Sequence, residues 1–137
     1  MNKEVPMHLL EDITTYLVEQ GLVEGDGIDV YRDFKPESPD NIVSLHEYQG
    51  DPVSPYTEVV HRSVQIVVRN KNAEAARSLA IRLYKAFMSS AEDRRVDFTP
   101  TRWAQVYIRQ APHKFSQDES DRVHYGFNLG ITTIISE

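Results

Sequence analysis

The chain has 137 residues, of which 40% are hydrophobic and 26% charged, as expected for one globular domain spanning residues 1–137. It has no cysteine, which excludes disulfides, thiol catalysis and cysteine-ligated metal sites, and no apolar run of the roughly 18 residues that a membrane span requires. The formal net charge is −6, with 21 acidic and 15 basic side chains, so the chain lacks the basic footprint of a tight nucleic-acid binder.

The first predicted element is an amphipathic helix over residues 7–20. Leu10, Ile13 and Leu17 recur at spacings of three and four, which places them on one face of a helix. Gly21 follows directly, and glycine readily adopts the left-handed conformation in which many helices end. We therefore expect the helix to pack one apolar stripe against a core and to stop at Gly21.

Three strands are predicted between this helix and the next. Residues 28–34 and 42–48 are short β-favouring segments separated by turn signals. Residues 49–57 hold two prolines and a glycine, so we expect an extended loop, because proline cannot donate to a sheet ladder. Residues 58–69 form a longer alternating run, with Val60, Val64, Ile66 and Val68 on one face and His61, Ser63, Gln65 and Arg69 on the other. Such alternation indicates a sheet with only one face on the core.

A second helix and two further strands complete the predicted elements. Asn72 is a suitable N-cap for an alanine-rich helix over residues 73–88. A polar connector is expected at 89–101 and a long acidic loop at 111–122, between strands 103–110 and 123–135. The first of these strands directs Ala104, Val106 and Ile108 inward, and Trp103, Gln105, Tyr107 and Arg109 outward. The last directs Val123, Tyr125, Phe127, Leu129 and Ile131 to one face, and His124, Gly126, Asn128, Gly130 and Thr132 to the other.

These elements predict an α+β fold in the order α-β-β-β-α-β-β. We expect a five-stranded mixed or antiparallel sheet with both helices packed on one face, because each helix has a single apolar stripe. The order of the strands within the sheet stays open at this point. The outer face is too polar for a second core and unusually rich in aromatic and long side chains for plain surface.

No set of residues predicts a reaction. The histidines lack the spacing with which one helix holds a metal, although His46 and His61 could meet across neighbouring strands. Ser63 shares a face with His61, but no third residue is indicated to orient the pair, and Arg62 points to the margin of the core. The acids at 118–121 lack the glycine turn and final glutamate of a calcium loop. We therefore predict no catalytic, cofactor-binding or metal-binding residues.

Several segments together resemble one family. They are PDNIVSLHEYQG (39–50), VVHRSVQIVVRNKNAEAARSLAIRLYKAF (59–87), RWAQVYIRQAP (102–112) and YGFNLG (125–130). In order and spacing they resemble the minor capsid or tail-completion (tail terminator-like) neck proteins of long-tailed bacteriophages and prophages of Gram-positive bacteria. The resemblance covers nearly the whole chain, and none of its motifs is a chemical signature.

This resemblance implies a structural protein of the virion neck or tail, assembled in the host cytoplasm. It implies a homo-oligomeric ring, expected to be a hexamer, that ends the tail tube and joins it to the head. Its partners would be further copies of itself, the tail-tube protein and a head-completion or connector protein, with DNA sliding through without specific binding and no membrane contact. The expected oligomer interface on the outer face comprises Trp103, Tyr107, Arg109, Gln65, Arg69 and Asn128.

Three alternatives stay open on the sequence. The nearest is a head-completion or minor capsid protein of the same neck. A soluble partner-binding domain would show the same patterns, and a small enzyme on an α+β sheet is disfavoured by the missing motifs. The mass of the protein in solution separates a ring from a monomeric domain or enzyme.

Overall fold

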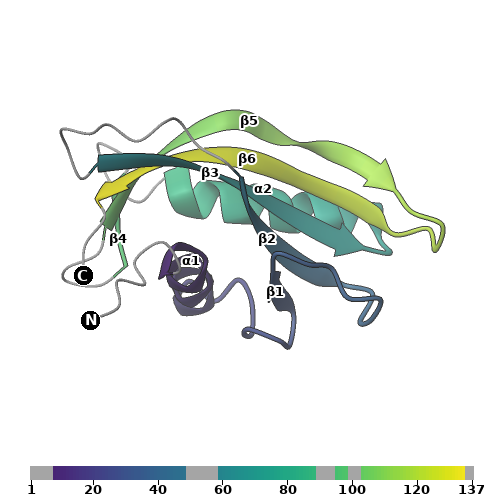
Figure 1. Ribbon diagram of the computed structural model, residues 1–137. Helices are drawn as coiled ribbons and strands as arrows, with labels where there is room; N and C mark the ends of the chain where they lie inside the picture. Colours follow the sequence, from purple (N-terminus) through teal and green to yellow (C-terminus); the bar gives the residue numbers. More distant parts are fainter. Residues whose placement is uncertain (1–7, 49–58, 89–94, 99–102, 135–137) are drawn as a thin grey trace.

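The computed structural model describes residues 8–48, 59–88, 95–98 and 103–134, which form two helices and a six-stranded mixed, curled sheet (Figure 1). The elements are α1 (His8–Glu19), β1 (Val30–Arg32), β2 (Ile42–Tyr48), β3 (Val59–Asn70), α2 (Ala73–Met88), β4 (Arg95–Asp97), β5 (Trp103–Gln117) and β6 (Val123–Ile134). The predicted α+β fold is confirmed, with one strand more than expected.

The sheet has the order β1-β2-β3-β6-β5-β4, which the sequence left open. Only β1 and β2 are parallel, and every other neighbouring pair is antiparallel. The long strands β3 and β6 therefore form the centre of the sheet, while β1 lies at one edge and β5 with β4 at the other. Figure 1 shows the sheet curving over α2, with β5 at the top of the view and β1 at the bottom.

Both helices bury their apolar stripes in one core on the concave side of the sheet. In α1 the predicted Leu10, Ile13 and Leu17 are buried, and the core also contains Ala76 and Ala80 of α2. The small alanines let the axis of α2 approach β3, β5 and β6, all of which it contacts. The two helices meet through an aromatic pair, because the ring of Tyr16 lies 5.4 Å from the ring of Phe87.

The start of α2 and the end of α1 lie where the sequence predicts them, and capping hydrogen bonds stabilise both. The side-chain oxygen of Asn72 accepts a hydrogen bond from the backbone N–H of Ala75 at 2.9 Å, so Asn72 is the N-cap of α2. Gly21 has a φ of +74° and follows the end of α1. The N–H groups of Gly21 and Leu22 bond the carbonyl oxygens of Val18 and Leu17, which satisfies acceptors that a helix end leaves free.

The predicted facing of the long strands is confirmed. The side chains of Val60, Val64, Ile66 and Val68 in β3 and of Val123, Phe127, Leu129 and Ile131 in β6 are buried. Ala104 and Val106 of β5 are buried as well, and Ile108 packs against the same core while partly exposed. The alternate residues of these strands therefore form the convex outer face.

Three sequence predictions require correction. The connector predicted at 89–101 contains a sixth strand, β4, which pairs with the start of β5 through Arg95↔Gln105, Val96↔Ala104 and Asp97↔Trp103. The predicted acidic loop at 111–122 was wrong over most of its length, because β5 continues to Gln117. The strand predicted at 28–34 is shorter and ends at Arg32, where Asp33 adopts a φ of +65°. The loop predicted at 49–57 lies outside the described residues.

The extension of β5 was hidden by irregular pairing. Register shifts fall between Ile108 and Gln110, between Gln110 and His113, and between Lys114 and Ser116. Each extra residue reverses the alternation of the side chains after it, so the inward positions no longer recur with period two. A polar, out-of-phase segment was therefore interpreted as a loop.

Candidate functional site

Five of the six predicted interface residues lie together on the outer face, and we call this group the open patch: Gln65, Trp103, Tyr107, Arg109 and Asn128. The register places Gln65 opposite Asn128, and Asn128 opposite Gln110. Tyr107 lies opposite Gly130, in the row of pairs beside it. The patch therefore crosses β3, β6 and β5, three strands that the sequence could not order.

Tyr107 is the most exposed aromatic residue of the open patch, and its position depends on a glycine. A Cβ atom built on Gly130 would lie 2.1 Å from the ring carbon Cζ of Tyr107, so the ring lies across the glycine. Arg109 donates a hydrogen bond from Nη2 to the hydroxyl of Tyr107 at 3.0 Å, and its guanidinium carbon lies 5.4 Å from the ring centroid. Tyr107 thus lies across Gly130 and beside Arg109, with 39% of its surface exposed.

The rim of the open patch also carries paired side chains. The amide nitrogen of Asn128 donates to the side-chain oxygen of Gln110, a residue that sequence reasoning missed because it follows the first register shift of β5. At the other end, the guanidinium of Arg95 lies 4.8 Å from the centroid of the Trp103 ring. These contacts restrict the conformations of long side chains at both ends of the patch.

The residues considered for chemistry are separated by the register. His46 lies opposite Gln65, and His61 opposite Thr132, so the two histidines do not form a cross-strand pair. Each is close to a hydroxyl instead, His61 Nδ1 at 2.8 Å from Thr132 and His46 Nε2 at 2.9 Å from Ser44. Among the described residues no group of three or more histidine and acidic side chains is placed to hold a metal ion.

Arg62 occupies the position predicted for it. Its Nε donates to a carboxylate oxygen of Glu47 on the neighbouring strand, with both side chains about a fifth exposed. The expected ion pair at the margin of the core is therefore present, and it joins β2 to β3.

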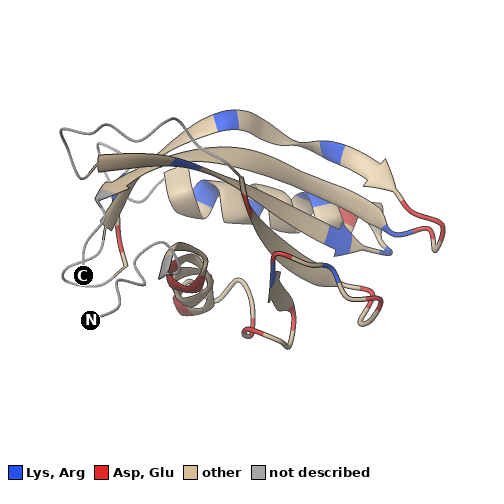
Figure 2. Cartoon of the chain, in the orientation of Figure 1, with Lys and Arg blue, Asp and Glu red and all other residues tan. Residues whose placement is uncertain are grey.

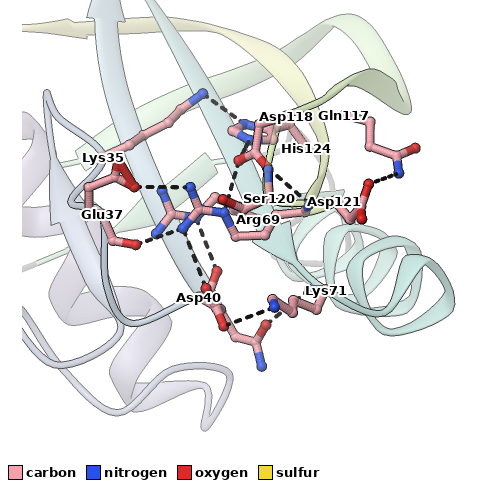
Figure 3. Close-up of polar contacts among 12 residues, drawn as sticks. Lys35, Glu37, Asp40, Arg69, Lys71, Gln117, Asp118, Ser120, Asp121 and His124 are labelled. Carbon is pink, nitrogen blue, oxygen red and sulfur yellow. Dashed lines mark hydrogen bonds and ion pairs between the residues drawn. The ribbon is translucent and has the colours of Figure 1, made fainter.

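The sixth predicted residue, Arg69, lies at the other end of the outer face, which we call the sealed end. Residues 33–41, between β1 and β2, lie over this end, and Arg69 is only 3% exposed. Its guanidinium donates to the carbonyl oxygen of Asp40 at 3.0 Å, and Figure 3 shows these two residues side by side. It also donates to the carbonyl oxygen of Pro39 at 2.7 Å. Arg69 therefore binds the chain's own loop and offers no free surface in this structure.

Arg122 ties the same loop to the β5–β6 turn. It donates to the carbonyl oxygen of Glu37 at 2.6 Å and to the carboxylate of Asp118 at 2.9 Å. A carboxylate oxygen of Asp40 lies 3.5 Å from its guanidinium. Asp118, one of the acids at 118–121 that were considered as a cation site, is therefore already paired with Arg122.

His124 completes the sealed end between Lys35 and Asp118 (Figure 3). The ammonium of Lys35 lies 3.2 Å from Nδ1, and Nε2 lies 3.1 Å from the Asp118 carboxylate. A neutral ring satisfies both contacts, accepting from Lys35 and donating to Asp118. Burial lowers the pKa of His124, and the charge of Lys35 lowers it further, against the opposing effect of Asp118.

The contacts of Asp118 lower the pKa of its carboxyl group. Burial alone raises the pKa of this carboxyl group, but hydrogen bonds from His124 and from the backbone and side chain of Arg122 outweigh it. The net result is a pKa well below the ordinary value, so Asp118 is held as a carboxylate. The sealed end is therefore a structural network whose charges are matched within the chain.

Comparison with known proteins identifies the family. The model of the family described as "Bacteriophage tail terminator protein" matches residues 13–135. No curated protein sequence matches the chain. No helix in the described parts of the chain is long and apolar enough to cross a membrane. Because the match covers most of the chain, from within α1 to the end of β6, the chain belongs to the bacteriophage tail terminator family, whose members are structural, non-enzymatic components of the virion tail.

Proposed function

We propose that this protein forms a homo-oligomeric ring, a hexamer, that ends the tail tube in the virion neck and joins it to the head. The observation that carries this proposal is the open patch. Within it Tyr107 and Arg109 are exposed and bonded to each other, while the sealed end of the same face is closed by the chain's own loop. Tyrosine, tryptophan and arginine are the residues most enriched at protein interfaces.

The open patch suits contacts between copies in a ring. A closed ring requires two different surfaces that meet head to tail, and an asymmetric sheet face with two unlike edges provides them. The remaining surfaces then face along the ring axis. There we propose the tail-tube protein on one side and a head-completion or connector protein on the other.

The charge of the chain is compatible with a channel for DNA. With a net charge of −6 the ring repels phosphate on average, so DNA can slide without specific binding. Family membership supports the tail terminator over the head-completion protein that the sequence left open.

The proposal is tested by measuring assembly on tail tubes of the phage or prophage that encodes this chain. We expect light scattering to give six times the 15.8 kDa chain mass for the assembled ring. Tyr107→Glu should stay folded by circular dichroism but assemble poorly, because it places a charge in a desolvated contact. Ile81→Glu is the matched control, since Ile81 is 36% exposed on α2 and lies outside the patch.

Two results would contradict the proposal. One is a wild-type chain that stays monomeric in the presence of tube ends. The other is a Tyr107→Glu variant that assembles and joins heads to tails as efficiently as the control.

A further inference from the structure

The charges of this chain are distributed unevenly along its length. Residues 1–58 contain 13 acidic and 3 basic side chains, whereas residues 59–137 contain 8 acidic and 12 basic ones. Part of this difference lies at the two edges of one sheet, because residues 24–34 around β1 hold four acids and one arginine, whereas β5 holds Arg109 and Lys114 and no acid. Figure 2 shows red residues gathered on the segments around β1 and blue residues along β5.

The acidic edge of the sheet comprises residues 24–34, and we call it the β1 edge. Its exposed acids include Glu24 and Asp26, the latter paired to Arg32 at 2.9 Å. The same segment exposes the two most accessible large apolar side chains of the described residues, Ile28 at 58% and Phe34 at 56%. An apolar centre surrounded by charged groups is the usual anatomy of a protein interface.

Tyr31 contacts both apolar residues of the β1 edge, Phe34 through its ring and Ile28 through the backbone. Its ring packs edge-on against Phe34 with centroids 5.5 Å apart, and its hydroxyl donates to the carbonyl oxygen of Ile28 at 3.3 Å. Tyr31 thus links Phe34 to the backbone of Ile28 within this exposed group.

The second surface is the β5 edge, residues 107–114. Strand β5 contains no acidic residue, and Arg109 and Lys114 are both exposed. Strand β4 pairs only with residues 103–105, so within the described residues the rest of β5 has no neighbouring strand on this side. Tyr107 provides an exposed apolar surface beside Arg109.

Both edges are unsuited to backbone pairing with another strand. On β5, Pro112 lacks the N–H donor, and three register shifts bend the strand, which are established ways of blocking edge pairing. On β1, Val30 is bonded by its own turn, to the N–H of Gly27 at 2.8 Å and to the carbonyl oxygen of Gly25 at 3.2 Å. A contact made by these edges must therefore use side chains.

We infer that the β1 edge of one copy docks on the β5 edge of the next copy, an inference that rests on the proposed ring. Ile28 and Phe34 supply the apolar centre against Tyr107, and the acids around them face Arg109 and Lys114. Opposite charges on opposite edges favour head-to-tail contact, whereas two identical edges repel each other. The outcome is a closed ring in preference to a two-fold dimer.

Reciprocal charge reversal tests this pairing. One variant carries Arg109→Glu and Lys114→Glu, so that both of its edges are acidic. The other carries Glu24→Lys and Asp26→Lys, so that its β1 edge loses its acidic character. We expect each variant alone to assemble at least tenfold more weakly than wild type in sedimentation velocity at about 0.15 M salt. An equimolar mixture should recover rings in which the two variants alternate.

Controls separate this inference from the proposed ring itself. Arg82→Glu, on the solvent side of α2, should assemble like wild type, and circular dichroism should show all variants folded. If wild type forms rings and the two reversed variants do so equally well, the edge pairing is wrong and the ring stands. If each variant fails alone and their mixture also fails, the pairing of these two edges is contradicted. A wild-type chain that never assembles would contradict the ring, and this inference with it.

Discussion

The two ends of the outer face are made of similar residues but differ in what covers them. At the sealed end, Arg69 and His124 are 3% and 8% exposed, because residues 33–41 lie over them. Pro39 and Asp40 accept the hydrogen bonds of Arg69, and the His124 ring is bonded by Lys35 on one side and by Asp118 on the other. In the open patch, Arg109 donates to the hydroxyl of Tyr107, and both side chains remain exposed. Both ends follow the same alternation of β3, β6 and β5, so alternation alone cannot distinguish them.

This difference separates a polar sheet surface that the chain covers itself from one that stays exposed. Buried charged groups must be paired, and a chain that pairs them internally leaves nothing for a second molecule. We therefore expect the sealed end to contribute to stability, whereas assembly is the role proposed for the open patch. Substitutions at the two ends should separate these effects.

The largest difference is expected between two glycines of β6. Alanine at Gly126, near the sealed end, would place its Cβ 2.1 Å from the carbonyl oxygen of Ile66 and 3.0 Å from the Cα of Val67. Since neighbouring backbone cannot yield without disturbing the ladder, we expect Gly126→Ala to lower the free energy of unfolding by about 3 kcal/mol or more. Urea denaturation followed by circular dichroism measures this.

Gly130 in the open patch is the matched comparison. Alanine there meets the ring of Tyr107, a side chain that can swing away. We expect Gly130→Ala to cost about 1 kcal/mol, and to cost less still in a Tyr107→Ala background. Equal losses of unfolding free energy in Gly126→Ala and Gly130→Ala would contradict this comparison, because both sites would then accommodate the added methyl group equally well.

The second comparison uses two residues of β3 on the same face. Arg69→Ala removes the donors that hold the carbonyl oxygens of Pro39 and Asp40, and we expect a loss of about 2–3 kcal/mol. Gln65→Ala, four residues earlier in the open patch, should change the stability by less than about 0.5 kcal/mol. Thermal and urea unfolding of both variants would check this, and a Gln65 effect as large as that of Arg69 would contradict it.

The sequence predicted the parts of the fold that depend on local pattern. The stripe of Leu10, Ile13 and Leu17 and the alternation of Val60 to Val68 follow directly from helix and strand periods, and both were confirmed. Strand β4 was missed because it has only three residues, two of them charged. The end of β5 was missed because bulges change the phase of its alternation.

The sealed end could not be predicted for a different reason. Arg69 is 29 and 30 residues from its partners Asp40 and Pro39, and Arg122 is 85 from Glu37. These contacts depend on β3 lying between β2 and β6, and the sequence left that order open. A polar residue on an outer strand face has the same local pattern whether a loop covers it or not.

The smallest effect expected is a dependence of stability on pH that comes from the sealed end. Burial and then the charge of Lys35 lower the pKa of His124 below its ordinary value of 6.5. Burial and Lys35 also lower the pKa of His46, against the charge of Asp33. As pH falls through 6.5, the unfolded chain therefore takes up protons before the folded one, and stability decreases. Asp118 adds a second loss below its ordinary value of 3.8, because its pKa is lowered in the folded state.

His124→Gln separates these contributions. Glutamine cannot titrate, so the decrease in stability between pH 7 and pH 5 should become shallower than in wild type, with the part due to His46 remaining. The decrease below pH 4 should be weaker in Asp118→Asn, because the carboxyl group that takes up a proton there is gone. Urea unfolding across this pH range measures both slopes. If the stability of His124→Gln followed the wild-type curve at every pH, protonation of His124 would not be a cause of the lower stability in acid.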